Sequence, residues 1–241
     1  LVDVFSGGRL ILGIGTGGSH TRDFDAYGIP VADRFSRLEE SISLLRRLWA
    51  GEEVTHEGRH FRVESFTLGP LPRQPGGPPL WIGARGPRSI RRAARLGDAL
   101  LTVIMAPLDA LVEHRRIYEE SVRALGRDPS RAAVPIVREV YVGETRKEAE
   151  TRARRLIGGL YQKIYWPWDL AAPVDESIGL QPAWVVGDVE TVVQTIRGYE
   201  EKLGATHLIC RMVYPGMSPK EAREAIERFG REVIPRFRDD A

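Results

Sequence analysis

The sequence predicts an α/β fold built around parallel β-strands. Short apolar runs bounded by glycine alternate along the chain with amphipathic helical patterns, and strands separated by helices form parallel βαβ units. A chain of 241 residues is long enough for one large core, and single α/β barrels commonly reach this length. We therefore expect residues 1–241 to form one barrel-type domain.

Five of the predicted strands are expected to be parallel. They are residues 9–17, 80–84, 98–104, 134–142 and 206–214. A TIM-type (α/β)8 barrel has eight strands, so we expect a barrel that lacks its first three, with an open doubly wound sheet as the alternative. Residues 1–15 read as the end of a helix leading into a strand, so we expect that roughly 80–100 preceding residues, about three βα units, are missing from this sequence.

Amphipathic helices are predicted between these strands. Asp33 is expected to cap a helix that runs through Leu48, and Asp188 a helix that runs to Leu203. Residues 54–68 alternate about Glu57-Gly58, which predicts a β-hairpin. Four further helices are expected at residues 87–96, 107–125, 145–160 and 218–237.

Composition excludes several classes of function. The net charge of +2, with 28% charged residues of both signs, does not favour nucleic-acid binding. No apolar run approaches the roughly 18 residues of a membrane helix. The single cysteine, Cys210, cannot form an internal disulfide, and no histidine pair has the spacing of metal ligands. We expect a cytoplasmic protein without a metal site.

A phosphate site is predicted at the turn between the strand at 80–84 and the helix at 87–96. A helix N-terminus carries a partial positive charge and unpaired N–H donors, both of which favour an anion. The arginines at 88, 91, 92 and 95 are expected to be mostly a solvated helix face. Gly13, Gly15 and Gly18 match a dinucleotide-binding G-x-G-x-x-G only weakly, because a polar loop rather than a helix follows them.

Several segments, taken in order, resemble the luciferase-like monooxygenases, the superfamily of bacterial luciferase with its flavin- and deazaflavin-dependent relatives. They are SGGRLILGIGTGG at 6–18, DRFSRLEESISLLRRLW at 33–49, EGRHFRV at 57–63, PPLWIGARGPRSIRRAARLGDALL at 78–101 and VVGDVETV at 185–192, followed by LGATHLICRM and FGREVIPRF. The resemblance implies an (α/β)8 barrel of which this chain contains the fourth strand onward.

The resemblance also implies which residues hold the cofactor. The loop equivalent to 84–89 binds the flavin phosphate in this family, and by position the contributing residues here are Ala84, Arg85, Gly86 and Ser89. The flavin ring is expected to lie against Gly15, Thr16, Gly17 and Gly18, where a side chain would collide with it. Some deazaflavin relatives have an acidic residue at the position of Gly18, so its absence favours FMN over coenzyme F420.

The expected function is a flavin-dependent monooxygenase that uses reduced FMN and O2 on a small organic substrate. His20 is the candidate acid or base, with a surface histidine as the alternative. The aromatic insertion at 158–184 is either a substrate lid or a packing or dimer contact. The resemblance implies a separate flavin reductase as partner and a homodimer. The alternatives are a deazaflavin-dependent hydride-transfer enzyme of the same fold and a non-catalytic binding module.

Overall fold

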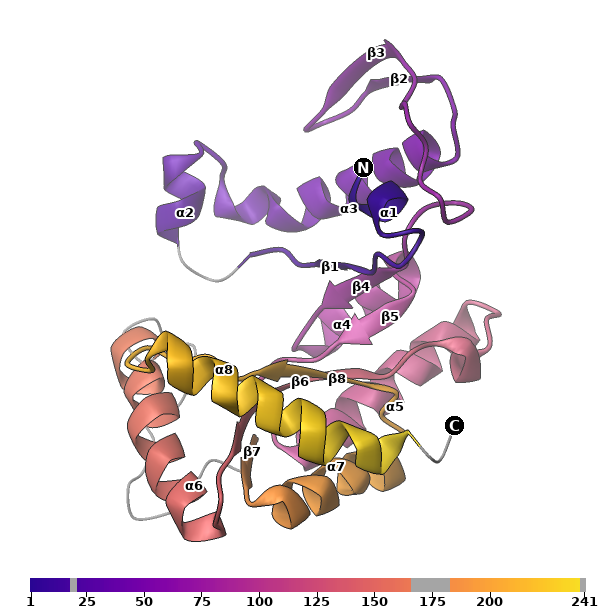
Figure 1. Cartoon of the computed structure of the whole chain (residues 1–241). Coiled ribbons are helices and arrows are strands. Elements are labelled where there is room, and N and C mark those ends of the chain that lie inside the picture. Colours follow the sequence, from indigo (N-terminus) through magenta and orange to yellow (C-terminus); the bar gives the residue numbers. More distant parts are fainter. Residues whose placement is uncertain (18–20, 166–182, 239–241) are drawn as a thin grey trace. The chain divides into compact units, whose positions relative to one another are not determined.

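The computed structural model describes the whole chain except residues 18–20, 166–182 and 239–241 (Figure 1). Backbone contacts divide the chain into two compact units, the first formed by Leu1–Leu101 and Ile117–Ala132, the second by Thr102–Arg116 and Ala133–Ala241. The strands of the described part form two three-stranded parallel sheets and one antiparallel pair, not a closed barrel. The α/β class is thus confirmed, and the single, N-terminally incomplete barrel stays a prediction.

The sheet of the first unit contains three short parallel strands. They are β1 (Leu12–Ile14), β4 (Leu80–Gly83) and β5 (Ala99–Leu101), in the order β1-β4-β5. Ile14 lies opposite Ile82, and Gly83 lies opposite Leu101. All three strands fall within predicted ranges. β4 and β5 are largely buried, as is typical of short, continuous apolar runs in a parallel sheet, whereas the residues of β1 are half-buried or exposed.

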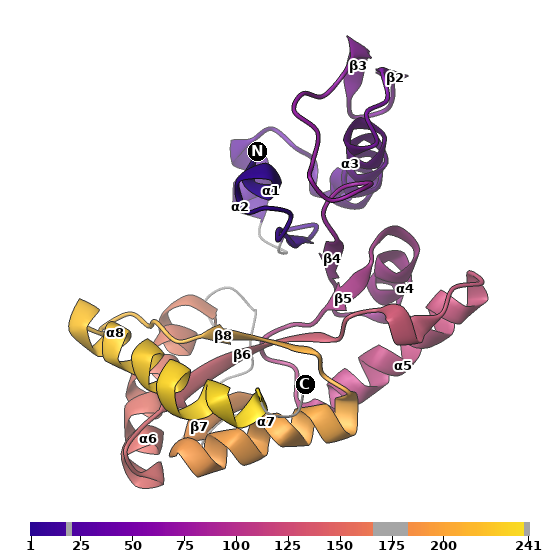
Figure 2. The same cartoon turned by 45° about the vertical axis from the view of Figure 1, so that its right-hand side comes forward.

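The helix α4 (Pro87–Leu96) connects β4 to β5 and packs against both strands (Figures 1 and 2). Its bounds match the prediction. Pro87 occupies the first helical position, where a missing N–H costs nothing. Ile90, Ala93 and Ala94 are buried, and their spacing places them on one face of the helix.

The other helices of the first unit precede α4 in the chain. The predicted helix after Asp33 is α3 (Arg34–Trp49), and Ile42 on its inner face is buried in the same core as α4. The six residues of α2 lie in a segment that the sequence indicated as a polar loop, since so short a helix carries no clear periodicity. The elements are α1 (Val2–Phe5), α2 (Thr21–Ala26), η1 (Val31–Asp33) and η2 (Pro129–Arg131).

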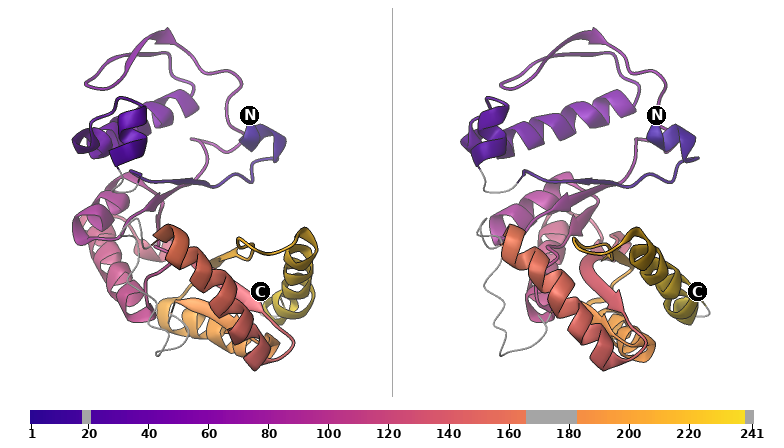
Figure 3. Two further views of the ribbon diagram at one scale, coloured as in Figure 1. Left: turned by 90° about the vertical axis from the view of Figure 1, so that its left-hand side faces the viewer. Right: turned by 60° about the vertical axis from the view of Figure 1, so that its left-hand side comes forward.

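The predicted hairpin, β2 (Val54–Glu57) with β3 (Arg62–Phe66), lies beside α3 (Figure 3). Glu40 of α3 joins the two. Its carboxylate accepts hydrogen bonds from the backbone N–H groups of His60 and Phe61 and lies 3.0 Å from Nε2 of His56. The hydrogen bond with His56, followed by those from the backbone, holds the pKa of Glu40 below its ordinary value of 4.5.

Replacing Glu40 should therefore loosen the hairpin in a pH-dependent way. A lowered pKa in the folded state means that the stabilisation is present above the unfolded-state pKa and is lost as the pH falls through the folded-state value. We expect Glu40→Gln to lower Tm at neutral pH, and the difference from wild type to shrink below about pH 4.5. Thermal unfolding over a pH series measures this. Glu52→Gln, which removes the exposed partner of Arg47, should change Tm little at any pH.

The sheet of the second unit has the order β7-β6-β8, with all pairs parallel. Its strands are β6 (Pro135–Val142), β7 (Trp184–Gly187) and β8 (His207–Arg211). The sequence predicted β6 and β8 but not β7, which begins at Trp184, the last residue of the predicted insertion, and ends just before the predicted cap Asp188. Pairing with β6, in which Glu139 lies opposite Trp184, turns this four-residue apolar run into a strand.

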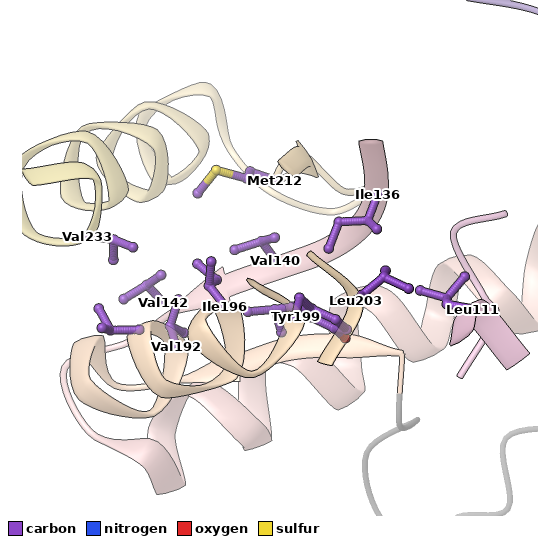
Figure 4. Packing of buried hydrophobic residues seen from close by; sticks show 12 residues of the cluster. Leu111, Ile136, Val140, Val142, Val192, Ile196, Tyr199, Leu203, Met212 and Val233 are labelled. Carbon is purple, nitrogen blue, oxygen red and sulfur yellow. The ribbon is translucent and has the colours of Figure 1, made fainter. Parts of the chain in front are cut away.

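Apolar side chains of β6 pack against those of α7 in the core of the second unit (Figure 4). Val140 and Val142 of β6 meet Val192, Ile196 and other buried residues of this cluster. The helical elements are α5 (Leu108–Ala124), whose first half belongs to this unit, α6 (Arg146–Ala153), η3 (Arg154–Gly158), η4 (Tyr161–Tyr165), α7 (Val189–Leu203), α8 (Pro219–Arg228), η5 (Phe229–Val233) and η6 (Ile234–Phe237). None of the described helices has both the length and the apolar character needed to cross a membrane.

One of the two predicted caps is confirmed. Asp188 accepts a hydrogen bond from the N–H of Thr191 at the start of α7. Asp33 precedes α3 but makes no side-chain cap. Its carboxylate instead binds the guanidinium of Arg59 from the hairpin at 2.6 Å. The sequence could not show this, because the competing partner lies 26 residues away.

Candidate functional site

Two of the predicted cofactor loops leave the same edge of the first unit's sheet. Because β1 and β4 are parallel and Ile14 lies opposite Ile82, Gly15 follows one strand at the edge where Ala84 follows the other. Ligands of parallel α/β sheets bind at the carboxyl ends of strands. The structure therefore brings the segments 15–17 and 84–89 to the same edge, as the sequence predicted.

The N-terminus of α4 leaves backbone donors unpaired at this edge. Gly86 is the N-cap residue and adopts extended backbone, and no side chain caps the helix. The N–H of Ile90 is the first to bond within the helix, to the carbonyl of Gly86. Among the described residues, the N–H groups of Arg88 and Ser89 have no acceptor. Two amides and the positive end of the helix dipole are thus available to an anion.

The surroundings of this N-terminus are open. A methyl group built on Gly86 would meet no atom within 4 Å, and one built on Gly15 would meet none either. Ser89 is partly exposed. The described structure therefore leaves room beside the N-cap of α4, where an anion could approach the helix end.

The predicted donors of this loop differ in what they can offer. Ala84 is buried and its N–H donates to the carbonyl of Leu101 at 3.3 Å. The expectation that its backbone donates to a phosphate is therefore wrong, because the neighbouring strand already uses this group. The side chain of Arg85 is exposed and forms no hydrogen bond or ion pair with any described residue, so it remains available to an anion.

The glycine loop after β1 contains one constrained and one unconstrained position. Gly17 has a φ of +77°, and a Cβ built there would lie 3.0 Å from the ring of Phe24. Gly15 has neither restriction. Thr16 is partly buried, and its hydroxyl lies 3.5 Å from the carbonyl of Gly17. Gly17 is therefore a glycine for reasons of the fold, whereas at Gly15 the described structure has room for a side chain.

Two predicted site residues, Gly18 and His20, lie outside the described residues, as does most of the insertion at 158–184. Each described end of that insertion contributes an aromatic residue to the core. Tyr161 and Trp184 are buried and pack edge to face, with ring centroids 5.5 Å apart. For these two aromatic residues the structure shows packing, as one of the two interpretations expected.

Two of the described histidines contact neighbouring hydroxyl groups, and a third is partly buried. Nε2 of His60 lies 2.7 Å from the Ser36 hydroxyl, and Nδ1 of His207 lies 2.8 Å from the Thr206 hydroxyl. His114 is partly buried, and burial lowers its pKa. Within the described part of the chain, no three potential metal ligands lie together.

The arginines of α4 are more than a solvated face. Glu39 binds Arg92 at 2.7 Å and Arg95 at 2.8 Å, and these contacts, with that of Arg95 the stronger, lower the pKa of the Glu39 carboxyl. Glu39 thus joins α3 to α4 through two ion pairs. The two other arginines, Arg88 and Arg91, are exposed and pair with no described residue. Because these two arginines are three residues apart, the sequence alone indicates that they lie on the same face of α4.

Comparisons with known proteins agree with this arrangement. The family model of luciferase-like monooxygenases matches residues 1–207. An F420-dependent glucose-6-phosphate dehydrogenase of Nakamurella multipartita is 31% identical over 96% of this chain and 69% of its own length. The oxygenase component of a flavin-dependent trigonelline monooxygenase of Acinetobacter baylyi is 26% identical over 98% of this chain and 70% of its own length.

A solved structure shares the fold. It is the oxygenating component of 3,6-diketocamphane monooxygenase from Pseudomonas putida in complex with FMN, with a TM-score of 0.76, 22% identity and coverage of 97% of this chain and 72% of that one. The family fold is the TIM barrel, and its members named here are flavin- or F420-dependent enzymes. Together these matches show that the chain belongs to the luciferase-like monooxygenase family.

Proposed function

We propose that this chain is an oxidoreductase that binds the phosphate of a flavin-type cofactor at the N-terminus of α4. The uncapped amides of Arg88 and Ser89 carry the proposal. They lie at the carboxyl edge of the sheet, beside the unobstructed Gly15. Membership of a family whose named relatives depend on flavin or F420 supports it.

The expected reaction is monooxygenation of a small organic substrate with reduced FMN and O2. The cofactor supplies the redox chemistry when bound, while the protein binds and orients it and excludes water. The trigonelline monooxygenase and the FMN complex of the diketocamphane enzyme support this choice. A separate reductase would deliver the reduced FMN, and a homodimer is the proposed assembly. His20 is the proposed acid or base.

A second candidate is hydride transfer with coenzyme F420. The F420-dependent dehydrogenase among the relatives supports it, and so does the pair of exposed arginines, Arg88 and Arg91, next to the proposed phosphate site. The third alternative, a binding module without catalysis, predicts that neither cofactor saturates the protein. Fluorescence titration of the purified chain with FMN and with coenzyme F420 separates the three.

Two glycine variants test where the ring lies. A Cβ added at Gly15 would contact no described atom. The free energy of unfolding of Gly15→Ala should therefore differ from that of wild type by less than about 0.5 kcal/mol. If the ring packs against this position, overpacking should weaken cofactor binding at least about fivefold. Gly17→Ala should instead destabilise the apo chain by about 1–2 kcal/mol, because of its positive φ and the Phe24 ring. Cofactor titration and urea unfolding of both variants measure this, and unchanged affinity in Gly15→Ala would place the ring elsewhere.

A further inference from the structure

An arginine-lined groove runs beside α4 in the first unit. Its volume is about 520 Å³. One wall is formed by four arginines of α4, and the other by the second half of α5. The lining residues are Arg88, Arg91, Arg92, Arg95, Ile117, Glu120, Ser121, Ala124 and Leu125.

The positive charge of this groove is only partly compensated, because its described lining contains four arginines and one carboxylate, that of Glu120 on α5. Glu39 binds Arg92 and Arg95, and the guanidinium of Arg92 also lies 4.3 Å from the ring centre of Phe35. These two arginines are fixed by the fold. Arg88 and Arg91 have no ion pair or hydrogen bond with another described residue, and both are exposed. The groove therefore presents two uncommitted guanidinium groups to solvent.

The groove reaches the first turn of α4, where the proposed phosphate site lies. Arg88 is the second residue of α4, adjacent to Ser89. Arg91 and Arg95 follow at spacings that keep them near the same face. Arg95 lies about 10 Å further along the helix axis than Arg88. A ligand whose phosphate sits on the amides of α4 and which continues past that phosphate would enter a positively charged channel.

We propose that this groove, here named the α4 arginine groove, binds an anionic extension of the cofactor beyond its phosphate. The inference rests on the proposed function. FMN ends at its phosphate, whereas coenzyme F420 continues through a phosphodiester into a chain of glutamates. Guanidinium groups pair well with carboxylates. The groove thus matches the polycarboxylate tail of the deazaflavin cofactor, the second candidate above, and offers that cofactor a contact that FMN has no group to make.

The test compares three probes on the purified chain by fluorescence titration. They are coenzyme F420 with its oligoglutamate chain, the glutamate-free form of the same coenzyme, and FMN. We expect the oligoglutamate form to bind about three- to tenfold more tightly than the glutamate-free form, as two exposed ion pairs allow. This preference should disappear in the double variant Arg88→Gln and Arg91→Gln, and at about 1 M salt.

Arg62→Gln is the matched control. Arg62 is exposed on β3, and its side chain has no described partner, so its loss should leave the preference unchanged. Equal affinity for the two deazaflavin forms, or a preference that survives in the double variant, would overturn this inference and leave the proposed function standing. If Arg62→Gln lost the preference for the oligoglutamate form as fully as the double variant, the inference would also be overturned. The net charge of the protein, and not the groove, would then cause the preference. Failure of all three probes to bind would overturn the proposed function, and this inference with it.

Discussion

Replacing Ser89 by aspartate should weaken cofactor binding strongly without destabilising the fold. Ser89 is the third residue of α4, and the described helix end has no capping side chain. A carboxylate there interacts favourably with the helix dipole, worth about 0.3–1 kcal/mol, so the unfolding free energy should stay constant or rise. The same carboxylate would repel an incoming phosphate and compete for its amides.

The size of this effect follows from the bonds that are lost. Hydrogen bonds to charged groups contribute about 1.5–3 kcal/mol each, so we expect Ser89→Asp to reduce FMN or F420 affinity by at least about tenfold. Equilibrium titration measures the affinity, and urea unfolding of the same preparation measures stability. A lower affinity together with an unchanged or higher unfolding free energy would show that the helix end at Ser89 acts in binding rather than in stabilising the fold.

Two controls make this result specific. Ser89→Ala keeps the backbone N–H and removes only the hydroxyl, so its affinity should fall by less than about threefold. Riboflavin has the ring but no phosphate, and its binding should be the same in wild type and Ser89→Asp. If the aspartate variant bound FMN as tightly as wild type, the phosphate would not lie on the amides of α4.

The elements predicted correctly are those whose signals are local. Pro87 at the first position and Gly97 just after the last residue fix the ends of α4, and the spacing of its buried residues fixes the inner face. Asp188 caps α7 through an amide three residues away. In each case, the residues that decide the structure lie within one or two turns of one another.

The predictions that failed depend on partners distant in sequence. The strand β7 exists because its residues pair with β6 more than 40 positions earlier. The amide of Ala84 is lost as a phosphate donor because Leu101, on the next strand, accepts its hydrogen. The local sequence pattern predicted that the phosphate loop starts at Ala84. The register of the sheet decides which backbone amides of that loop remain without an acceptor.

The buried pair of Glu139 and Arg211 is another feature set by register. These residues lie opposite each other on β6 and β8, and Nε of Arg211 donates to the Glu139 carboxylate at 2.8 Å. Glu139 is fully buried, whereas the side chain of Arg211 is 32% exposed. Burial lowers the pKa of Arg211. The two partners therefore differ in their access to water, and their removal should have unequal consequences.

Arg211→Met should be the more damaging change. It leaves a buried carboxylate without its partner, and breaking a buried pair in this way costs about 3–5 kcal/mol. Glu139→Gln leaves Arg211 without its carboxylate partner, but the Arg211 side chain reaches solvent. We therefore expect a smaller loss of stability, about 1–2 kcal/mol. Urea unfolding measures both. Lys220→Ala, which breaks an exposed pair with Glu224, should stay within about 0.5 kcal/mol of wild type.

Adding Glu139→Met to Arg211→Met should restore much of the lost stability, because two apolar side chains replace the uncompensated charge. Lowering the pH should also narrow the difference between Arg211→Met and wild type, since protonation removes the buried negative charge. If the arginine and glutamate variants lost equal stability, and the double variant showed no recovery, the damage would come from lost packing in the second unit. The charge of Glu139 would then be of little consequence for folding.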